Sequence, residues 1–406
     1  MEEIKQGYKQ TDIGVIPEDW EVKTIGKIGL FSKGNGISRA ESNTGIIPSV
    51  RYGEIYTTHD NYIKKFYSFI SLEIANRAKK LKVGDILFTA SGETKEDIGK
   101  NVAFIDDIEA YAGGDIIILS PKNADSLFLG YLFNAPYVAK QKANKGQGDA
   151  VVHITKDSLR DIVVAIPKFI SEQTAIATAL SDTDALIAAL DKKIAKKQQI
   201  KQGAMQQLLT GKKRLPGFSG EWVEKRLGEG LRFQTGDPFS SLYFNANKQG
   251  IRLIKNRDLK SDDQVIYYSG SYTSDFLVNN GDVLIGMDGD FLPCIWNKGT
   301  ALLNQRVGRL IFKSDWNPNF LFYYLYNPLK DLQEATGATT VKHLSHKDVE
   351  EMVLPLPPTS NEQTAIAQIL TDMDNEIAKL EKERDKYKDL KAGMMQVLLT
   401  GKVRLV

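Results

Sequence analysis

Cysteine and histidine, which serve as nucleophiles, zinc ligands and general bases, are scarce in this sequence of 406 residues. It has one cysteine, Cys294, and four histidines, His59, His153, His343 and His346, too few for a disulfide framework or a Cys/His zinc site. His153 and His343 occupy equivalent positions in an internal repeat, but no serine or cysteine recurs with them to form a nucleophile–base pair. A structural role or contact with DNA is therefore a better interpretation of these two histidines than catalysis.

Three short motifs look like catalytic signatures, but each is incomplete. FSKGNG (31–36) resembles a cofactor glycine loop, yet no helical pattern follows it, and its repeat FQTGDP (233–238) lacks the second glycine. NAPY (134–137) lacks the first proline of the Asn-Pro-Pro-Tyr motif of amino-methyltransferases, so we interpret it as a helix terminus. TGKK (210–213) lacks the upstream glycine of a phosphate-binding loop. The sequence carries no complete catalytic signature.

Charge and hydropathy exclude further classes of protein. The chain has 53 basic and 51 acidic residues, a net charge of +2, and 42% apolar residues, as expected for a folded, soluble protein. No apolar run reaches the ~18 residues of a membrane span, and the amino terminus lacks a signal-peptide core, so we expect a cytoplasmic protein. Residues 192–214 hold eight lysines and arginines and no acid, a pattern that suits phosphates, an acidic partner or a solvated helix face.

An internal repeat organises the chain. Residues 171–215 and 361–405 align without a gap at an offset of 190, and 25 of the 45 positions are identical. Weaker matches precede each copy, such as GDIL (84–87) with GDVL (281–284). The chain therefore alternates a variable domain, a constant segment, a second variable domain and a second constant segment.

The constant segments are predicted to be two long helices that pair with each other. Apolar residues along both segments alternate steps of four and three, as in the seam of a coiled coil. Ser171 and Asn361 are suitable amino-terminal caps, and Gly211 and Gly401 stand where carboxyl-terminal glycines belong. Residues 171–209 would form a rod of roughly 58 Å at ~1.5 Å per residue. An apolar stripe of that length requires a partner, and the second copy in the same chain is the natural one.

Each variable segment is predicted to be a mixed α/β domain with short strands. VGDILFTA (83–90), DIIILS (115–120) and DVLIGM (282–287) are apolar, β-branched runs bounded by turn residues. Residues 126–135 and 319–327 have the pattern of buried helices that end near a proline. The predicted organisation is an arm (1–16), a first variable domain (17–168), a central helix (169–215), a second variable domain (216–358) and a carboxyl-terminal helix (359–406).

Along its whole length the chain resembles the specificity subunit of type I restriction–modification enzymes. The most specific marks are YKQTDIGVIPEDWEVKTIGKI (8–28), the SEQTAIA and NEQTAIA helices with their LLTGK ends, and NQRVGRL (304–310). The resemblance implies that each variable domain is a target recognition domain that reads one half of a bipartite, asymmetric site in double-stranded DNA. It also implies that the two helices pair antiparallel with pseudo-twofold symmetry, separate the domains and dock two methyltransferase subunits, which restriction (helicase-nuclease) subunits then join.

The resemblance further implies that this subunit has no catalytic centre, which agrees with the incomplete motifs. S-adenosylmethionine, ATP and Mg would belong to the partner subunits, and so would the DNA adenine methyltransferase and ATP-dependent endonuclease activities. Two alternatives compete with this interpretation. A protein–protein scaffold could carry two binding modules on a coiled-coil rod, whereas a self-contained methyltransferase would require the cofactor loop and the Asn-Pro-Pro-Tyr motif that are missing.

Base-edge reading requires amide, guanidinium and carboxylate groups on loops, while basic groups position phosphates. We therefore expect DNA contacts from polar loop residues at repeated positions. In the first domain these are Lys33, Asn35, Arg39, Arg51, Tyr52, Ser91, Lys95, Lys145, Gln147 and His153. In the second domain they are Lys255, Asn256, Arg257, Asp288, Asn304, Gln305, Arg306, Thr339, Lys342 and His343.

The partner-binding surface is expected at the ends of the constant helices, although the apolar residues there could equally belong to the coiled-coil seam. The candidates are Glu172, Gln173, Met205, Gln206 and Leu209 with Glu362, Gln363, Met395, Gln396 and Leu399.

Overall fold

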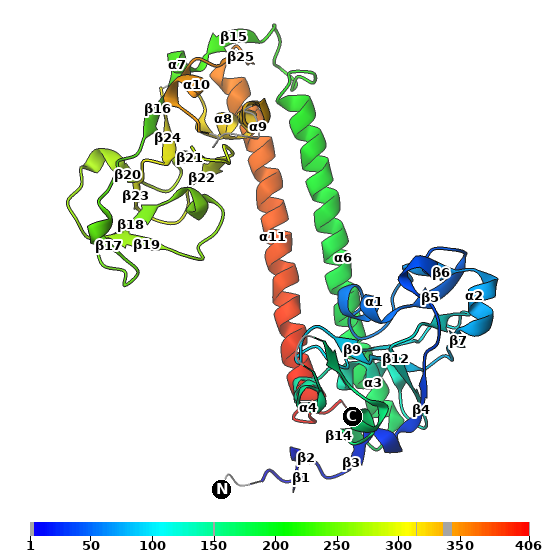
Figure 1. Ribbon diagram of the computed structural model, residues 1–406. Helices are drawn as coiled ribbons and strands as arrows, with labels where there is room; N and C mark the ends of the chain where they lie inside the picture. Colours follow the sequence, from blue (N-terminus) through cyan, green and yellow to red (C-terminus); the bar gives the residue numbers. More distant parts are fainter. Residues whose placement is uncertain (1–3, 149–150, 314, 336–342, 406) are drawn as a thin grey trace. The chain divides into compact units, whose positions relative to one another are not determined.

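The computed structural model describes residues 4–148, 151–313, 315–335 and 343–405. The chain forms two compact units (Figure 1). Unit 1 comprises Met1–Asp191 and Glu383–Val406, and unit 2 comprises Lys192–Lys382. Each unit therefore combines one variable domain with one half of each long helix.

The variable domain of unit 1 is built from two small sheets flanked by short helices. One sheet has the order β10-β8-β12-β4 and the other β6-β5-β11-β7, while β1 pairs with β2, β3 with β14 and β9 with β13. The strands are β1 (Tyr8–Thr11), β2 (Gly14–Pro17), β3 (Trp20–Thr24), β4 (Gly29–Lys33), β5 (Ile47–Val50), β6 (Ser68–Ile70), β7 (Lys79–Lys80), β8 (Ile86–Thr89), β9 (Ser91–Gly92), β10 (Asn101–Ala103), β11 (Tyr111–Ala112), β12 (Ile116–Pro121), β13 (Val152–His153) and β14 (Val163–Pro167). The helices are α1 (Tyr52–Thr57), α2 (Leu72–Arg77), α3 (Ser126–Leu132), α4 (Pro136–Lys145), α5 (Lys156–Arg160) and the long α6 (Ile170–Leu208).

The variable domain of unit 2 repeats this plan. Its sheets have the orders β16-β24-β21-β22 and β17-β19-β18-β23-β20, and β15 pairs with β25 as β3 pairs with β14. The strands are β15 (Val223–Arg226), β16 (Leu231–Thr235), β17 (Phe244–Asn245), β18 (Ile251–Ile254), β19 (Ile266–Tyr268), β20 (Leu277–Val278), β21 (Val283–Gly286), β22 (Pro293–Ile295), β23 (Ala301–Leu303), β24 (Val307–Phe312) and β25 (Val353–Leu356). The helices are α7 (Leu227–Gly230), α8 (Pro318–Tyr324), α9 (Tyr326–Ala335), α10 (His346–Glu350) and the long α11 (Ser360–Leu398).

The mixed α/β class and the repeated strands predicted from the sequence are confirmed. The predicted apolar runs form β8, β12 and β21, and the predicted buried helices form α3 and α8. The strands β8 and β12 are buried along most of their length because they lie centrally in their sheet, which explains their continuous apolar sequence.

Helices α6 and α11 each contain 39 residues, as the repeat predicts. In unit 1 the amino-terminal half of α6 lies against the carboxyl-terminal half of α11, where Nζ of Lys391 is 2.7 Å from Oδ1 of Asp184. In unit 2 the other halves meet, and Nζ of Lys201 is 2.5 Å from Oδ1 of Asp374. The helices therefore pair antiparallel inside each unit, and part of the basic stretch 192–214 is neutralised by acids of α11.

The two ends of each long helix differ in how well the sequence predicted them. The predicted caps Ser171 and Asn361 are each wrong by two residues because the helices begin at Ile170 and Ser360, and Oγ1 of Thr359 accepts the Glu362 amide at 3.3 Å. The predicted carboxyl-terminal glycines are confirmed by left-handed backbones, with φ of +67° at Gly211 and +71° at Gly401. A Cβ at Gly211 would crowd the Trp222 side chain, and a Cβ at Gly401 would crowd the Pro17 ring.

The apolar seam positions of the long helices pack against the variable domains as well as against the other helix. Ile176 and Leu180 are fully buried in the core of the first variable domain, together with Leu398 and Leu399 at the end of α11. Their repeats in α11 are buried in the core of unit 2 with the end of α6. The apolar stripe thus anchors each domain to both helices, besides joining the helices to each other.

Candidate nucleic-acid interface

The repeated histidines are held in the same way in both units. Strand β13 places His153 opposite Ser91 of β9, and Nδ1 of His153 lies 2.9 Å from Oγ of Ser91. In unit 2, His343 pairs with Asp288, and its Nδ1 lies 2.9 Å from Oδ1 of that carboxylate. Both histidines are exposed, so each can present its Nε2 edge to a ligand.

In unit 1 the histidine lies at a cavity of about 420 Å³ on the variable domain. Its polar lining includes Lys33 from the end of β4, Ser91, Asp115, His153 and Lys156. The site therefore combines two ammonium groups with a carboxylate, a hydroxyl and an imidazole. Such a mixture can contact phosphates and base edges at the same time.

In unit 2 the corresponding place is organised around Asp288. Its carboxylate accepts from Nη1 of Arg306 at 3.2 Å, and its backbone carbonyl accepts from Nδ2 of Asn256 at 2.5 Å. Oδ1 of Asn304 accepts the amide of Arg306 at 3.3 Å, and Gln305 is exposed beside them. The predicted cluster Asn304–Arg306 is therefore a tight turn, and its Arg306 side chain reaches the Asp288 carboxylate.

A second pair of equivalent loops follows β5 and β18. Arg51 precedes α1 and Lys255 precedes a 3-10 helix at Asn256–Leu259, and the backbone amide of each donates to an acid three residues later, Glu54 or Asp258. Nε of Arg51 also donates to Glu54 at 3.3 Å and to Oγ of Ser68 at 3.2 Å. The Arg51 side chain therefore closes a turn inside the domain, and its contact with DNA stays a prediction.

The other predicted DNA contacts in this second pair of loops differ in exposure and in their contacts within the domain. Tyr52 is exposed, and so is Arg257, whose Nε is 3.9 Å from Asp258. Nζ of Lys255 lies 4.9 Å from the centroid of the Phe244 ring, a cation–π contact that holds the ammonium at the domain surface.

Other predicted contacts lie elsewhere on the first domain. Arg39, which begins a 3-10 helix (Arg39–Glu41), and Lys95, which lies between β9 and β10, are both exposed. Nδ2 of Asn35 donates to the carbonyl of Arg77 at 2.7 Å, and Nζ of Lys145 is 3.7 Å from Asp161, so both have partners within the domain. Gln147 pairs through its backbone with His153, which brings it to the histidine cluster. Thr339 and Lys342 lie outside the described residues.

Six of the ten residues of the predicted partner surface have side chains that are buried inside the chain. The carboxylate of Glu172 binds Arg404 and Nε1 of Trp20, and that of Glu362 binds Arg214. Glu172, Gln173, Leu209, Glu362, Gln363 and Leu399 are all 5% exposed or less. Glutamate and glutamine at these positions could be taken for surface residues because one sequence does not show the domain that covers them.

The two buried glutamines show which residues of the variable domains contact the long helices. Oε1 of Gln173 accepts the amide of Asp125 and its Nε2 donates to the carbonyl of Pro167, while Oε1 of Gln363 accepts the amide of Asn317. These glutamines therefore fasten the start of each long helix to the variable domain. Of the remaining candidates, Met205 and Met395 are half-buried, and Gln206 and Gln396 are exposed.

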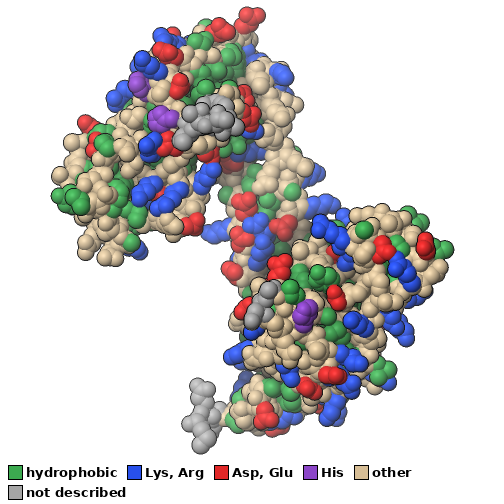
Figure 2. Space-filling model, in the orientation of Figure 1, with side chains coloured by type: hydrophobic (Ala, Val, Ile, Leu, Met, Phe, Trp, Pro, Cys, Tyr) green, Lys and Arg blue, Asp and Glu red, His purple; other side chains and the backbone are tan. Residues whose placement is uncertain are grey.

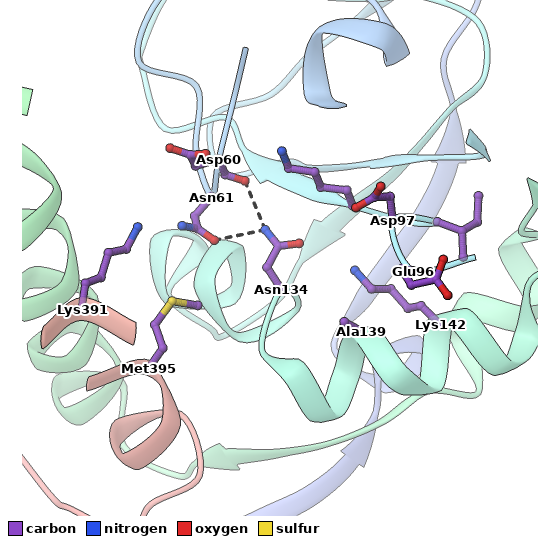
Figure 3. A pocket seen from close by; sticks show the side chains of 11 residues that line it. Asp60, Asn61, Glu96, Asp97, Asn134, Ala139, Lys142, Lys391 and Met395 are labelled. Carbon is purple, nitrogen blue, oxygen red and sulfur yellow. Dashed lines mark hydrogen bonds between the residues drawn. The ribbon is translucent and has the colours of Figure 1, made fainter. Parts of the chain in front are cut away.

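A further cavity of about 370 Å³ lies in unit 1 where α4 approaches α11 (Figure 3). Nδ2 of Asn134 donates to the carbonyl of Asp60 and to Oδ1 of Asn61, so the NAPY segment is a helix junction between α3 and α4, as predicted. Lys142 also lines this cavity; its burial lowers the pKa of its ammonium to about 7, and Nζ donates to the carbonyl of Gly99 at 2.7 Å. Since a buried lysine of this kind favours its neutral form, it is a poor phosphate ligand.

Charge on the surface is locally mixed. Figure 2 shows lysine and arginine side chains spread over the visible face and interspersed with acids. No group of three or more His, Cys, Asp or Glu residues that could hold a metal occurs in the described part of the chain. Within the same residues, no helix has the length and hydropathy required to cross a membrane.

Sequence reasoning missed two members of the histidine cluster, Asp115 and Lys156. Asp115 was assigned to the start of a strand, and Lys156 begins a helix of five residues, so neither seemed to be on a ligand-binding loop. Alignment of the two repeats at offset 191 pairs Asp115 with Arg306, and this signal was present in the sequence.

Comparison with known proteins agrees with this geometry. The family model described as "Type I restriction modification DNA specificity domain" matches residues 17–202 and 219–387. The MjaVIII type I restriction enzyme specificity subunit of Methanocaldococcus jannaschii is 28% identical, with 99% of this chain and 98% of that protein covered. The EcoBI specificity subunit of Escherichia coli is 33% identical over 45% of this chain and 39% of its own length.

A solved structure shares the fold. The S subunit of a type I restriction–modification system from M. genitalium is 14% identical, has a TM-score of 0.63 and covers 93% of this chain and 96% of its own. Because the family model covers most of the chain, including both variable domains and both long helices, the protein belongs to the type I restriction–modification DNA specificity family.

Proposed function

We propose that each variable domain of this type I specificity subunit reads one half of a bipartite, asymmetric DNA site. The observation that carries the proposal is the duplicated histidine cluster, which has the same backbone frame in both units but different side chains. A homodimeric reader would require identical side chains and a palindromic site. Two different sets on one chain suit two different half-sites.

The long helices would dock two methyltransferase subunits, which restriction subunits then join. Two copies of one helix sequence offer two equivalent surfaces to identical partners. Gln206 and Gln396 remain as exposed candidates near the helix ends, and Lys192, Lys193 and Lys196 are exposed farther along α6. In this proposal S-adenosylmethionine, ATP and Mg are bound by the partners, and the specificity subunit performs no catalytic step in the cytoplasm.

Reconstitution with the cognate methyltransferase subunit tests the proposal. The complex is expected to contain two methyltransferase subunits per chain, and sequencing of methylated DNA should reveal one motif with two unlike halves and a nonspecific spacer. Native mass spectrometry measures the stoichiometry, and gel shifts with the chain alone and in the complex measure DNA binding. Absence of sequence-specific DNA binding in both samples, with stable binding of proteins through the two domains, would support the scaffold alternative instead.

A further inference from the structure

We propose that one equivalent set of three side chains in each variable domain selects a base in the half-site of that domain. The set is Ser91, Asp115 and His153 in the first domain. In the second domain it is Asp288, Arg306 and His343. This inference rests on the proposed DNA-reading function and names the residues that would distinguish the two half-sites.

Backbone hydrogen bonds show that the three positions correspond. The amide of Ala90 donates to the carbonyl of Asp115 at 2.9 Å, and the amide of Met287 donates to that of Arg306 at 3.0 Å. On the other side, the carbonyls of Ala90 and Met287 accept from the residues that follow the histidines, at 2.9 and 2.8 Å. The three side chains therefore leave the same backbone frame in both units.

On this shared frame the two domains carry different charges. Position 91 is a neutral serine where position 288 is an aspartate, and position 115 is an aspartate where position 306 is an arginine. The histidine is the same in both domains and keeps the same 2.9 Å contact through Nδ1. The constant member can therefore support the site, while the two changed members give each domain a different pattern of donors and acceptors.

In the second domain the pattern suits guanine. Asp288 holds the Nη1 side of the Arg306 guanidinium at 3.1 Å, which restricts the orientation of the fork. The fork can still offer two other donors, Nε and Nη2, to the O6 and N7 acceptors of guanine in the major groove. Arg306 remains 53% exposed, as a residue that meets DNA must be in the free protein.

In the first domain the pattern suits an exocyclic amino group, such as N4 of cytosine. Asp115 lines the cavity that contains His153, and Lys33 and Lys156 line the same cavity. A carboxylate repels phosphates, so an acid at this place is more compatible with a base-edge donor than with the DNA backbone. The two lysines supply the charge that attracts the neighbouring phosphates.

The Asp115 backbone also indicates a constrained site. Its φ is +57°, in the left-handed region that residues other than glycine seldom adopt, although aspartate tolerates it better than most. The two preceding residues are glycines, Gly113 and Gly114, where the second domain has Asn304 and Gln305. The first domain therefore presents only one side chain from this turn, and that side chain is a hydrogen-bond acceptor.

The test compares variants of the full chain in the reconstituted methyltransferase complex, with binding measured on a library of randomised sites. Arg306→Lys keeps the charge but loses the bidentate fork, so it should keep most of its nonspecific affinity and lose about 10- to 100-fold of its preference at one G·C pair of one half-site. Asp115→Asn should alter preference at one pair in the other half-site only. Arg226→Ala is the matched control, because Arg226 is 54% exposed and pairs with an acid, Glu351, at 3.2 Å.

The possible outcomes distinguish failure of this inference from failure of the proposed DNA-reading function. The inference fails if Arg306→Lys lowers affinity by the same factor for every sequence and reduces the salt dependence of binding. It also fails if the variant leaves the recognised motif unchanged, because position 306 then does not read a base. If Asp115→Asn and Arg306→Lys change the same half-site, the two sets are not independent readers. If the wild-type complex itself shows no sequence preference, the proposed function fails.

Discussion

Arg404, at the end of the chain, forms a two-point ion pair with Glu172, with Nε 2.5 Å from Oε1 and Nη2 2.8 Å from Oε2. The repeat of this pair is Arg214 with Glu362, at 2.6 and 2.7 Å. Both glutamates are at most 3% exposed and stand in the first turn of α6 or α11. The residues just after one long helix thus fix the start of the other, once in each unit.

Removal of the arginine should be costly because it leaves a buried carboxylate without its counter-charge. Arg404→Ala is expected to destabilise unit 1 by ~3–5 kcal/mol, while the double variant Arg404→Met, Glu172→Gln, which removes the buried charge and keeps an acceptor for Nε1 of Trp20, should recover part of the loss. Hydrogen-exchange mass spectrometry can follow peptides of each unit separately. Arg214→Ala is the matched variant and should loosen unit 2; equal loosening of both units by either change would contradict independent clamps.

Lys142 should make stability depend on pH. Its folded pKa of about 7 is below the ordinary value of 10.5, so between these pH values the unfolded chain binds a proton that the folded chain does not. Its destabilising effect is therefore complete below pH 7 and fades as the pH rises toward 10.5. Lys142→Met should raise stability at pH 6 by about 2 kcal/mol, after allowance for the lost bond to Gly99, and the gain should shrink at pH 9.

Thermal unfolding of wild type and variant at several pH values measures this effect. Lys140→Met, on the same helix α4 but exposed, is the control for loss of a lysine charge. A gain from Lys142→Met that is the same at pH 6 and pH 9 would show that the ammonium is not kept neutral by its surroundings.

Exchange of residues 17–168 for the matching domain of a relative should change only one half of the methylated motif. The graft should keep three residues that hydrogen-bond to the long helices: Trp20 through its indole, Asp125 through its backbone amide, and Tyr131, whose hydroxyl donates to Asp184 at 2.6 Å. Their hydrogen bonds lie in or beside the buried core. Loss of these bonds would weaken packing of the domain on the helices, and a loss of methylation could then not be assigned to altered DNA reading. Methylation sequencing reads the outcome, and a change in both halves would mean that the domains do not read independently.

Gln305→Ala distinguishes base reading from phosphate contact in the second domain. Gln305 is exposed, and its turn is held by backbone bonds, so the substitution should leave the fold intact. Loss of a bidentate base contact should cost ~1–3 kcal/mol at one base pair, whereas loss of a phosphate contact should weaken all sequences alike. Asn304→Ala is less clean because Oδ1 of Asn304 accepts the Arg306 amide. Binding assays with each half-site randomised would show no change at all if Gln305 faces away from DNA.

The sequence by itself determined the duplication, the length of the two long helices and several strands. These features depend on local periodicity and on direct identity between repeats, as the bounds of α6 and α11 and the left-handed Gly211 and Gly401 show. It also singled out His153, Asp288 and Arg306 as candidates, because their types and repeated positions are visible without a fold.

Only the tertiary structure decided which polar residues are available to a ligand. Glu172 and Gln173 are polar residues at a predicted helix start and were expected at the surface, but both are buried, Glu172 against Arg404 and Gln173 against the variable domain. Asp115 is remote from His153 along the chain, and pairing of β12 with β8 and of β13 with β9 brings both to one cavity. Burial and strand register arise from contacts between residues far apart in sequence, and no local pattern in one sequence records those contacts.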